Sequence, residues 1–166
     1  MRLEHLHLEQ FRRVASAAME LPPGATLFLG ENGQGKTTIL EAVHYLAIGR
    51  SIRTSRDKEC LPHRRTAAQA SERPTAITGR YDGRGGRHEV RAVLAADGKS
   101  FFRDGKPLRK LGDLLGGLQV VALVPGDLEI VRGGPKERRG LLDALLARTN
   151  AHNLTCLLYT SDAADE

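Results

Sequence analysis

The chain has 166 residues, enough for one globular domain or for one domain with a small lobe. Only 4% of the residues are aromatic, and no apolar run approaches the ~20 residues that a membrane span needs, so a transmembrane protein is excluded. The two cysteines have neither a disulfide framework nor a metal-ligand spacing, and the formal net charge is +5. We therefore expect a cytoplasmic protein.

The N-terminal residues predict two paired strands. Residues 1–11 alternate apolar and polar side chains, with Leu6 and Leu8 on one side, which is typical of a half-buried strand. The segment Ala17–Leu21 can pair back with it, and Pro22-Pro23-Gly24 then supplies a turn.

The next segment predicts a strand, a glycine-rich loop and a helix, in that order. The apolar run Ala25–Leu29 is interpreted as a buried strand. Apolar residues recur at helical spacing over residues 36–48, and Gly49 stands where a C-terminal cap belongs. The apolar face of this helix is expected to comprise Ile39, Leu40, Val43, Leu46 and Ala47.

The middle of the chain predicts a loop followed by a small antiparallel meander. Residues Arg50–Pro74 show no period and are expected to form a loop with one short helix. Three strand-like runs, Thr75–Tyr81, His88–Ala95 and Ser100–Arg103, are separated by Asp-Gly and Gly-Gly turn signals.

The last part of the chain returns to mixed elements, so the predicted fold class is α/β. We expect a short helix at Leu108–Leu115, an apolar strand at Leu118–Val124, one helical turn at Asp127–Val131 and a helix at Lys136–Arg148. The expected organisation is an N-terminal part of a nucleotide-binding head (1–49), a basic β lobe (50–110), a return to the head (111–155) and a tail (156–166).

Positive charge is concentrated in the middle of the chain. Residues 50–110 hold 16 Lys or Arg against 7 Asp or Glu, a local balance of +9. Such a block indicates a polyanionic partner. A solvated, arginine-rich surface without a partner remains an alternative on composition alone.

Residues Gly30–Thr37 match the phosphate-binding pattern G-x-x-x-x-G-K-[ST]. Its glycines let successive backbone N–H groups curl around a phosphate, and Lys36 would reach the β and γ phosphates. The Thr37 hydroxyl would ligate Mg²⁺, and the N-terminus of the following helix adds a positive dipole end. An incidental glycine-rich turn is disfavoured because a predicted strand precedes the loop and a predicted helix follows it.

The pattern predicts nucleotide binding rather than hydrolysis. Hydrolysis also requires an acidic residue for Mg²⁺ and water, supplied by a separate strand. The only later candidate, Leu118–Val124, ends in Pro125-Gly126-Asp127, which places Asp127 after a turn instead of at the strand tip. We therefore assign no catalytic residue.

Four segments together resemble the RecF family of bacterial recombination mediators, whose ATPase heads are similar to those of ABC, SMC and Rad50 proteins. The segments are Leu8–Arg12, Gly30–Ala42, Gly49–Arg53 and Val124–Asp143. The similarity covers residues 1–154. One departure is Gly126, which stands where the family usually has Glu, and this puts ATP turnover in doubt.

The resemblance implies an ATP- and Mg²⁺-dependent protein that binds single-stranded, duplex or gapped DNA in recombinational repair, replication and the SOS response. It also implies a homodimer at full length and recombination mediator proteins as partners. The residues implied to bind nucleotide are Gly30, Asn32, Gly33, Gln34, Gly35, Lys36, Thr37 (also for the metal) and Thr38, flanked by Arg12. Those implied to lie near nucleotide or DNA are Arg50, Arg53, Arg138 and Arg139, for which an ordinary structural or surface role remains open.

Two further alternatives bear on function. A nucleotide kinase or GTPase would need an arginine lid or an Asn-Lys-x-Asp base reader, and neither pattern occurs. A binding fragment without turnover is the physical expectation for these 166 residues. The last residues, Cys156–Glu166, resemble the translation of a sequencing adapter, and without them the net charge would be +8. A genuine acidic C-terminal tail remains the alternative.

Overall fold

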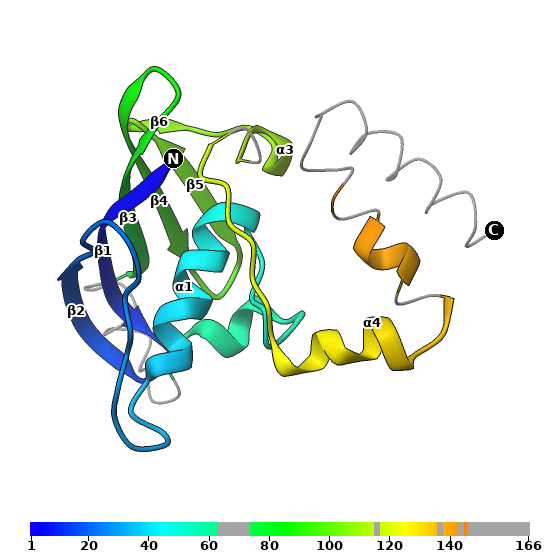
Figure 1. The fold of residues 1–166 in the computed structure, drawn as a ribbon. Helices are drawn as coiled ribbons and strands as arrows, with labels where there is room; N and C mark the ends of the chain where they lie inside the picture. The colour runs from blue at the N-terminus through cyan, green and yellow to red at the C-terminus, as the bar shows by residue number, and fades with distance from the viewer. Residues whose placement is uncertain (63–73, 115–116, 136–137, 143–144, 146–166) are drawn as a thin grey trace. The chain divides into compact units, whose positions relative to one another are not determined.

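The computed structural model describes residues 1–62, 74–114, 117–135, 138–142 and 145, and the chain divides into two compact units, Met1–Val120 and Val121–Glu166. In the first unit, a six-stranded antiparallel sheet carries the helix α1 (Lys36–Ile48) on one face (Figure 1). The predicted combination of strands and helices is therefore confirmed.

The sheet has the strand order β2-β1-β3-β4-β5-β6. The predicted N-terminal hairpin and the predicted meander are both present, and β3 pairs with β1, so one sheet runs through both. The strands are β1 (Arg2–Phe11), β2 (Val14–Glu20), β3 (Thr75–Gly83), β4 (Gly86–Leu94), β5 (Lys99–Arg103) and β6 (Lys106–Pro107).

The core lies between the sheet and α1. Leu6 and Leu8 of β1 are fully buried, as their alternation predicts, because residues two apart in a strand share one face. Tyr45 of α1 packs in an edge arrangement on Phe11, with ring centroids 6.3 Å apart, and stacks on Phe101 of β5 at 6.1 Å. These rings join the helix to both halves of the sheet.

The helix α1 has the predicted ends, but its predicted buried face is partly wrong. Leu46 and Ala47 are buried as expected, whereas Leu40 is 55% exposed and Ile39 and Val43 are only partly buried. The buried face also contains Thr38, Glu41, Ala42 and Tyr45. Contacts of the Tyr45 ring and an ion pair of Glu41 fix the rotation of the helix, and neither interaction is visible in a hydrophobic pattern.

The predicted strand Ala25–Leu29 is wrong, because this segment has no regular structure and exposes all its side chains except Phe28, which is partly buried. Leu27 and Leu29 are 78% and 81% exposed. A strand forms only where its N–H and C=O groups find a neighbouring ladder. The six described strands pair with one another, and none pairs with this run.

The predicted strand Leu118–Val124 is also wrong, and for the same reason. Its residues form coil, and Val121 and Leu123 are 88% and 90% exposed. The short elements around it agree better with the predictions. They are α3 (Leu111–Leu114) in the first unit, and η2 (Pro125–Leu128) and α4 (Glu129–Arg132) in the second.

Some predicted elements lie partly outside the described residues. The loop from Arg50 contains one short 3₁₀ helix, η1 (Asp57–Cys60), as expected, but residues 63–73 are not described. The helix predicted at Lys136–Arg148 is helical at 138–142 and 145, and its other residues, like the tail 156–166, lie outside the described part.

Cys60 is a free, buried thiol. Within the described residues, no helix combines the length and apolarity needed to span a bilayer.

Candidate nucleotide-binding site

The loop that precedes α1 has the backbone geometry of a phosphate cradle. Gly30, Gly33 and Gly35 have φ values of 149°, 87° and 93°, a region that residues with a Cβ rarely adopt. A Cβ at Gly33 would meet nothing within 4 Å, so the backbone there is open to an incoming group. The structure therefore gives a reason for the glycines of the motif, because the backbone at these positions has φ values that other residues rarely adopt.

The Lys36 ammonium lies inside this loop. Its Nζ donates to the carbonyl oxygens of Gly30 at 2.7 Å and Glu31 at 2.6 Å. The side chain of Gln34 accepts a hydrogen bond from the Glu31 N–H at 3.2 Å. The loop thus folds around a fixed positive charge, which fits a bound anion.

The N-terminus of α1 has backbone donors to offer. The N-cap is Gly35, which has no side-chain oxygen to bond the first turn, and the first ladder bond runs from the Ile39 N–H to the Gly35 carbonyl at 3.1 Å. The preceding N–H groups of Lys36, Thr37 and Thr38 therefore lack intrahelical acceptors. Such groups, together with the positive end of the helix dipole, stabilise a phosphate.

The three polar neighbours in the motif lie at different depths. Asn32 is exposed at the loop tip, Thr37 is exposed in the first turn, and Thr38 is 7% exposed and faces the core. In the described residues there is no group of three or more His, Cys, Asp or Glu side chains suited to a metal ion. A hydroxyl such as that of Thr37 is a ligand suited to Mg²⁺ shared with phosphate oxygens.

Arg12, expected beside the phosphates, is bound to Glu41 in this structure. Its Nε and Nη2 donate to the two carboxylate oxygens of Glu41, each at 2.6 Å, and Nη1 donates to the Glu59 carbonyl at 3.0 Å. The hydrogen bonds to Glu41 raise the pKa of the Arg12 guanidinium. A phosphate contact by Arg12 stays a prediction.

The other four predicted arginines lie in two places. Arg50 is exposed beside the end of α1, and Arg53, 49% exposed at its side chain, approaches Glu41 with an N–O distance of 3.8 Å. In the second unit, Arg138 and Arg139 are exposed and donate to the carbonyl oxygens of Gly133 and Pro135, at 3.1 and 3.4 Å. The first pair shares the unit of the loop, and the second pair does not.

Sequence reasoning gave no role to Glu41, the buried carboxylate at the centre of these contacts. It is 0% exposed although it is charged. Charged side chains are almost never fully buried unless they are paired. The sequence did contain a signal for this pairing. Glu41 lies among apolar residues of a predicted helix, and arginines occur in the segments before and after that helix.

Comparison with known proteins gives consistent matches. The AAA domain family model matches residues 5–111. The DNA replication and repair protein RecF of Myxococcus xanthus is 38% identical over 143 residues, covering 86% of this chain and 36% of that protein. The protein of the same name from Halalkalibacterium halodurans is 35% identical over 148 residues, covering 89% and 38%.

Solved structures agree with the sequence matches. Two structures of the recombination mediator protein RecF in the RecFOR pathway, RecF–ATPrS and RecF–ATP, each have a TM-score of 0.84 and 27% identity, and the first covers 95% of this chain and 41% of that chain. The SMC head domain from Thermotoga maritima has a TM-score of 0.55 at 20% identity, with 81% and 52% covered.

The chain therefore spans well under half the length of the curated relatives described above. The matches confirm the predicted fold class, an incomplete P-loop ATPase head of the ABC and SMC type with a small antiparallel β lobe.

Proposed function

Because this chain belongs to the RecF family, we propose that it is the nucleotide-binding part of an ATP-dependent, DNA-binding protein of recombinational repair and replication. The observation that carries the proposal is the cradle at Gly30–Thr37, with its left-handed glycines, its enclosed lysine and the open N-terminus of α1. A polyphosphate is the ligand that these groups fit best.

ATP would be held at the cradle by the chain's own donors. The N–H groups of the first turn and the Lys36 ammonium would bind the β and γ phosphates, and the Thr37 hydroxyl would share Mg²⁺ with them. Mg²⁺ would supply charge neutralisation between those phosphates. Asn32 and Gln34, at the loop tip, would line the same site. We propose binding without turnover, because Asp127, the acidic residue considered for this role, follows the run Leu118–Val124, which is coil and not a strand.

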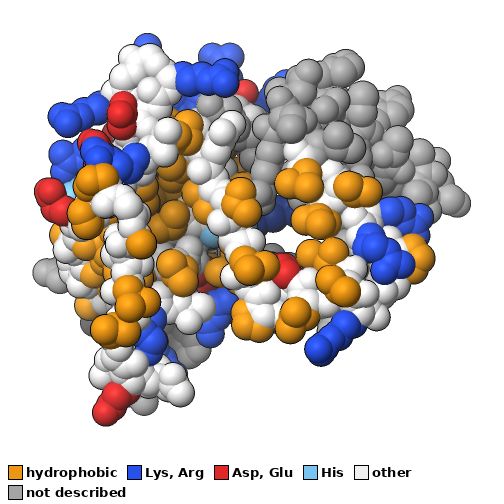
Figure 2. Space-filling view, viewed as in Figure 1, with side chains coloured by type: hydrophobic (Ala, Val, Ile, Leu, Met, Phe, Trp, Pro, Cys, Tyr) orange, Lys and Arg blue, Asp and Glu red, His pale blue; other side chains and the backbone are white. Residues whose placement is uncertain are grey.

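Duplex, gapped or single-stranded DNA is the proposed polyanionic partner of the basic β lobe. Exposed Lys and Arg side chains come together at one end of the sheet, because the start of β1, the β3–β4 turn and the β5–β6 turn meet there. Figure 2 shows Lys and Arg over this end, with a few acids between them. The exposed basic residues are Arg2, Arg84, Arg87, Lys106, Arg109 and Lys110.

Two further features of the proposal rest on the family alone. We propose that the full-length protein is a homodimer, and that recombination mediator proteins are its partners, as the RecFOR pathway named for the solved relatives suggests. The alternative of a nucleotide kinase or GTPase is not favoured, since the relatives found belong to neither class.

The direct test is DNA binding by this chain with ATP and Mg²⁺. Fluorescence anisotropy of a labelled gapped duplex would be measured between 50 and 200 mM salt, with and without nucleotide. We expect binding that strengthens with ATP and weakens about 10³- to 10⁵-fold over that range if six to ten phosphates are contacted. Affinity that is flat in salt would contradict the phosphate-contact account.

A further inference from the structure

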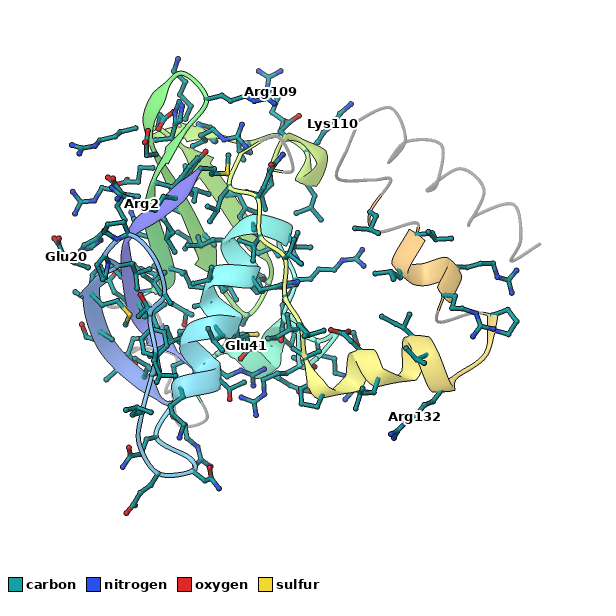
Figure 3. The ribbon with its side chains drawn as sticks, viewed as in Figure 1. Arg2, Glu20, Glu41, Arg109, Lys110 and Arg132 are labelled. Atoms are coloured by element: carbon teal, nitrogen blue, oxygen red, sulfur yellow. The ribbon has the colours of Figure 1, made fainter. Side chains whose placement is uncertain are left out.

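The Glu41 carboxylate is the meeting point of a buried polar cluster. Both of its oxygens accept hydrogen bonds from Arg12 at 2.6 Å, and Oε1 also accepts a hydrogen bond from the Ser51 hydroxyl. The Arg53 guanidinium lies 3.8 Å from Oε2. Figure 3 shows Glu41 on α1, which is the helix that begins at the phosphate cradle.

The cluster ties together segments that are far apart in the sequence. Arg12 follows the end of β1 and has a φ of 55°, a left-handed value that a residue with a Cβ rarely adopts. Its N–H donates to the Cys60 carbonyl at 2.8 Å, and its Nη1 donates to the Glu59 carbonyl. Arg12 thereby links the end of β1 to α1 and to the segment carrying η1, and the Tyr45 hydroxyl adds a bond from α1 to Asp57 of η1 at 2.8 Å.

The Ser51 hydroxyl links Glu41 to the backbone of the residues that follow Ser51. It donates to Glu41 and accepts from the N–H groups of Arg53 at 2.9 Å and Thr54 at 3.2 Å. The loop 50–54 is therefore anchored to α1 by the Ser51 hydroxyl, which the carboxylate holds, and also by the hydrogen bond between His44 Nδ1 and the Arg50 carbonyl oxygen at 2.9 Å. The backbone at Arg53 has its orientation set from Glu41.

Among Arg12, Glu41 and Arg53 the charges leave one cation in excess, and the nearby Glu59 also acts on Arg12. One carboxylate faces two guanidinium groups, and Arg12 takes both oxygens at short range. Arg53 is farther away and about half exposed, so its guanidinium is available to a second anion. Glu41 lies four residues, or about one helical turn, after Thr37 on the same helix.

We infer that Glu41 is a positioning residue of the phosphate site: through Ser51 and Arg12 it holds the loop 50–54 where the Arg53 guanidinium can contact the phosphates of a nucleotide in the cradle. The inference rests on the proposed function in that it takes the cradle to bind nucleotide. It adds that the strength of the contact from Arg53 depends on a buried side chain that touches no ligand.

The first test does not involve nucleotide. Amide hydrogen exchange would be measured in the wild type, in Glu41→Gln and in Ser51→Ala, with Glu20→Gln on the outer strand β2 as the matched change at an exposed glutamate (Figure 3). We expect the amides of Arg53 and Thr54 to exchange at least roughly tenfold faster in both cluster variants, because their acceptor is released or removed. The amides of the α1 centre should stay protected, and Glu20→Gln should change neither set.

The second test measures ATP affinity by titration calorimetry in a cycle of Arg53→Ala and Glu41→Gln. Arg53→Ala is expected to weaken ATP binding by roughly tenfold in the wild-type background, the loss of one charge-assisted contact. In the Glu41→Gln background the same change should cost less than about twofold, because the guanidinium no longer has a fixed place. A merely structural role would lower the melting temperature but leave the two Arg53 effects equal.

The outcomes separate the two proposals. Unchanged exchange at Arg53 and Thr54 in Ser51→Ala, a variant that leaves the Arg12–Glu41 pair in place, would overturn the positioning role. Equal effects of Arg53→Ala in the two backgrounds would overturn it as well. Absence of ATP binding by the wild type, with faster loop exchange in the variants, would refute the nucleotide site and this role of Glu41 toward it while leaving the loop anchor standing.

Discussion

Two Leu-x-Leu segments of the same unit differ in burial. Leu6 and Leu8 of β1 are fully buried, and their strand is hydrogen-bonded to β2 on one side and β3 on the other. Leu27 and Leu29, just before the cradle, are 78% and 81% exposed and belong to no strand. Both segments have leucines two residues apart, and what buries the first pair is a pairing strand on each side and α1 above the sheet.

The comparison is sharpened most by truncating one leucine in each segment. Leu8→Ala should lower the free energy of unfolding by about 2–5 kcal/mol, because it removes buried methyl groups and leaves a cavity. Leu29→Ala should change it by no more than about 0.5 kcal/mol, as for other exposed side chains. Urea denaturation followed by circular dichroism measures both. Equal losses in the two variants would mean that the run 25–29 is packed in solution.

A smaller difference is expected between two left-handed glycines. Gly49, at the end of α1, has a φ of 74°, and a Cβ there would lie 2.3 Å from Leu111 Cδ1. Gly24, in the exposed segment, has a φ of 94°, and a Cβ there would meet nothing within 4 Å. Alanine at either position would be strained by the positive φ, but only at Gly49 would its Cβ also clash with a neighbouring side chain.

Gly49→Ala should therefore destabilise the chain by about 2–4 kcal/mol, and Gly24→Ala by about 1 kcal/mol. Thermal melts of the two variants beside the wild type would measure the difference. If Gly24→Ala proved as costly as Gly49→Ala, contacts absent from the described structure would have to surround residue 24.

The smallest effect concerns an exposed pair at the end of the sheet. The Asp104 carboxylate accepts hydrogen bonds from the Glu89 N–H at 2.8 Å and from His88 Nδ1 at 2.9 Å. The first of these bonds chiefly lowers the pKa of Asp104 below 3.8, and the second raises the pKa of His88 above 6.5. The two groups should therefore stabilise each other only while both are charged.

The sign of the pH dependence follows from these directions. The His88 contribution is fully present below pH 6.5 and is lost as the pH rises through its raised pKa. The Asp104 contribution is present above pH 3.8 and is lost as the pH falls through its lowered pKa. An NMR titration of the His88 ring should give a higher pKa in the wild type than in Asp104→Asn. The same pKa in both proteins would show that the pair does not persist in solution.

The sequence predicted well the elements whose signals are local. The alternation of β1, the turns of the meander and both ends of α1, with Gly49 as its cap, agree with the structure. The G-x-x-x-x-G-K-[ST] pattern predicted the left-handed glycines of the loop, because the pattern places glycine where a backbone must curl closely around a phosphate. In each case, neighbouring residues contain all the necessary information.

The sequence predicted poorly what depends on distant partners. The strands expected at Ala25–Leu29 and Leu118–Val124 did not form, since a ladder needs a second strand that no local pattern supplies. The buried face of α1 differed because Glu41 pairs with Arg12, 29 residues earlier in the chain. The role of Glu41 could not be found by periodicity, which treats a charged residue as a mark of the exposed face.

The central claim is that the cradle binds nucleotide phosphates through Lys36. Titration calorimetry with ATP and Mg²⁺ on Lys36→Ala tests it most directly, with Lys58→Ala, an exposed lysine on η1, as the control. We expect Lys36→Ala to abolish measurable ATP binding while its circular dichroism spectrum and melting temperature stay close to those of the wild type, because the lysine stem faces the loop and not the core. Lys58→Ala should bind as the wild type does. Unchanged ATP affinity in a folded Lys36→Ala would contradict the assignment.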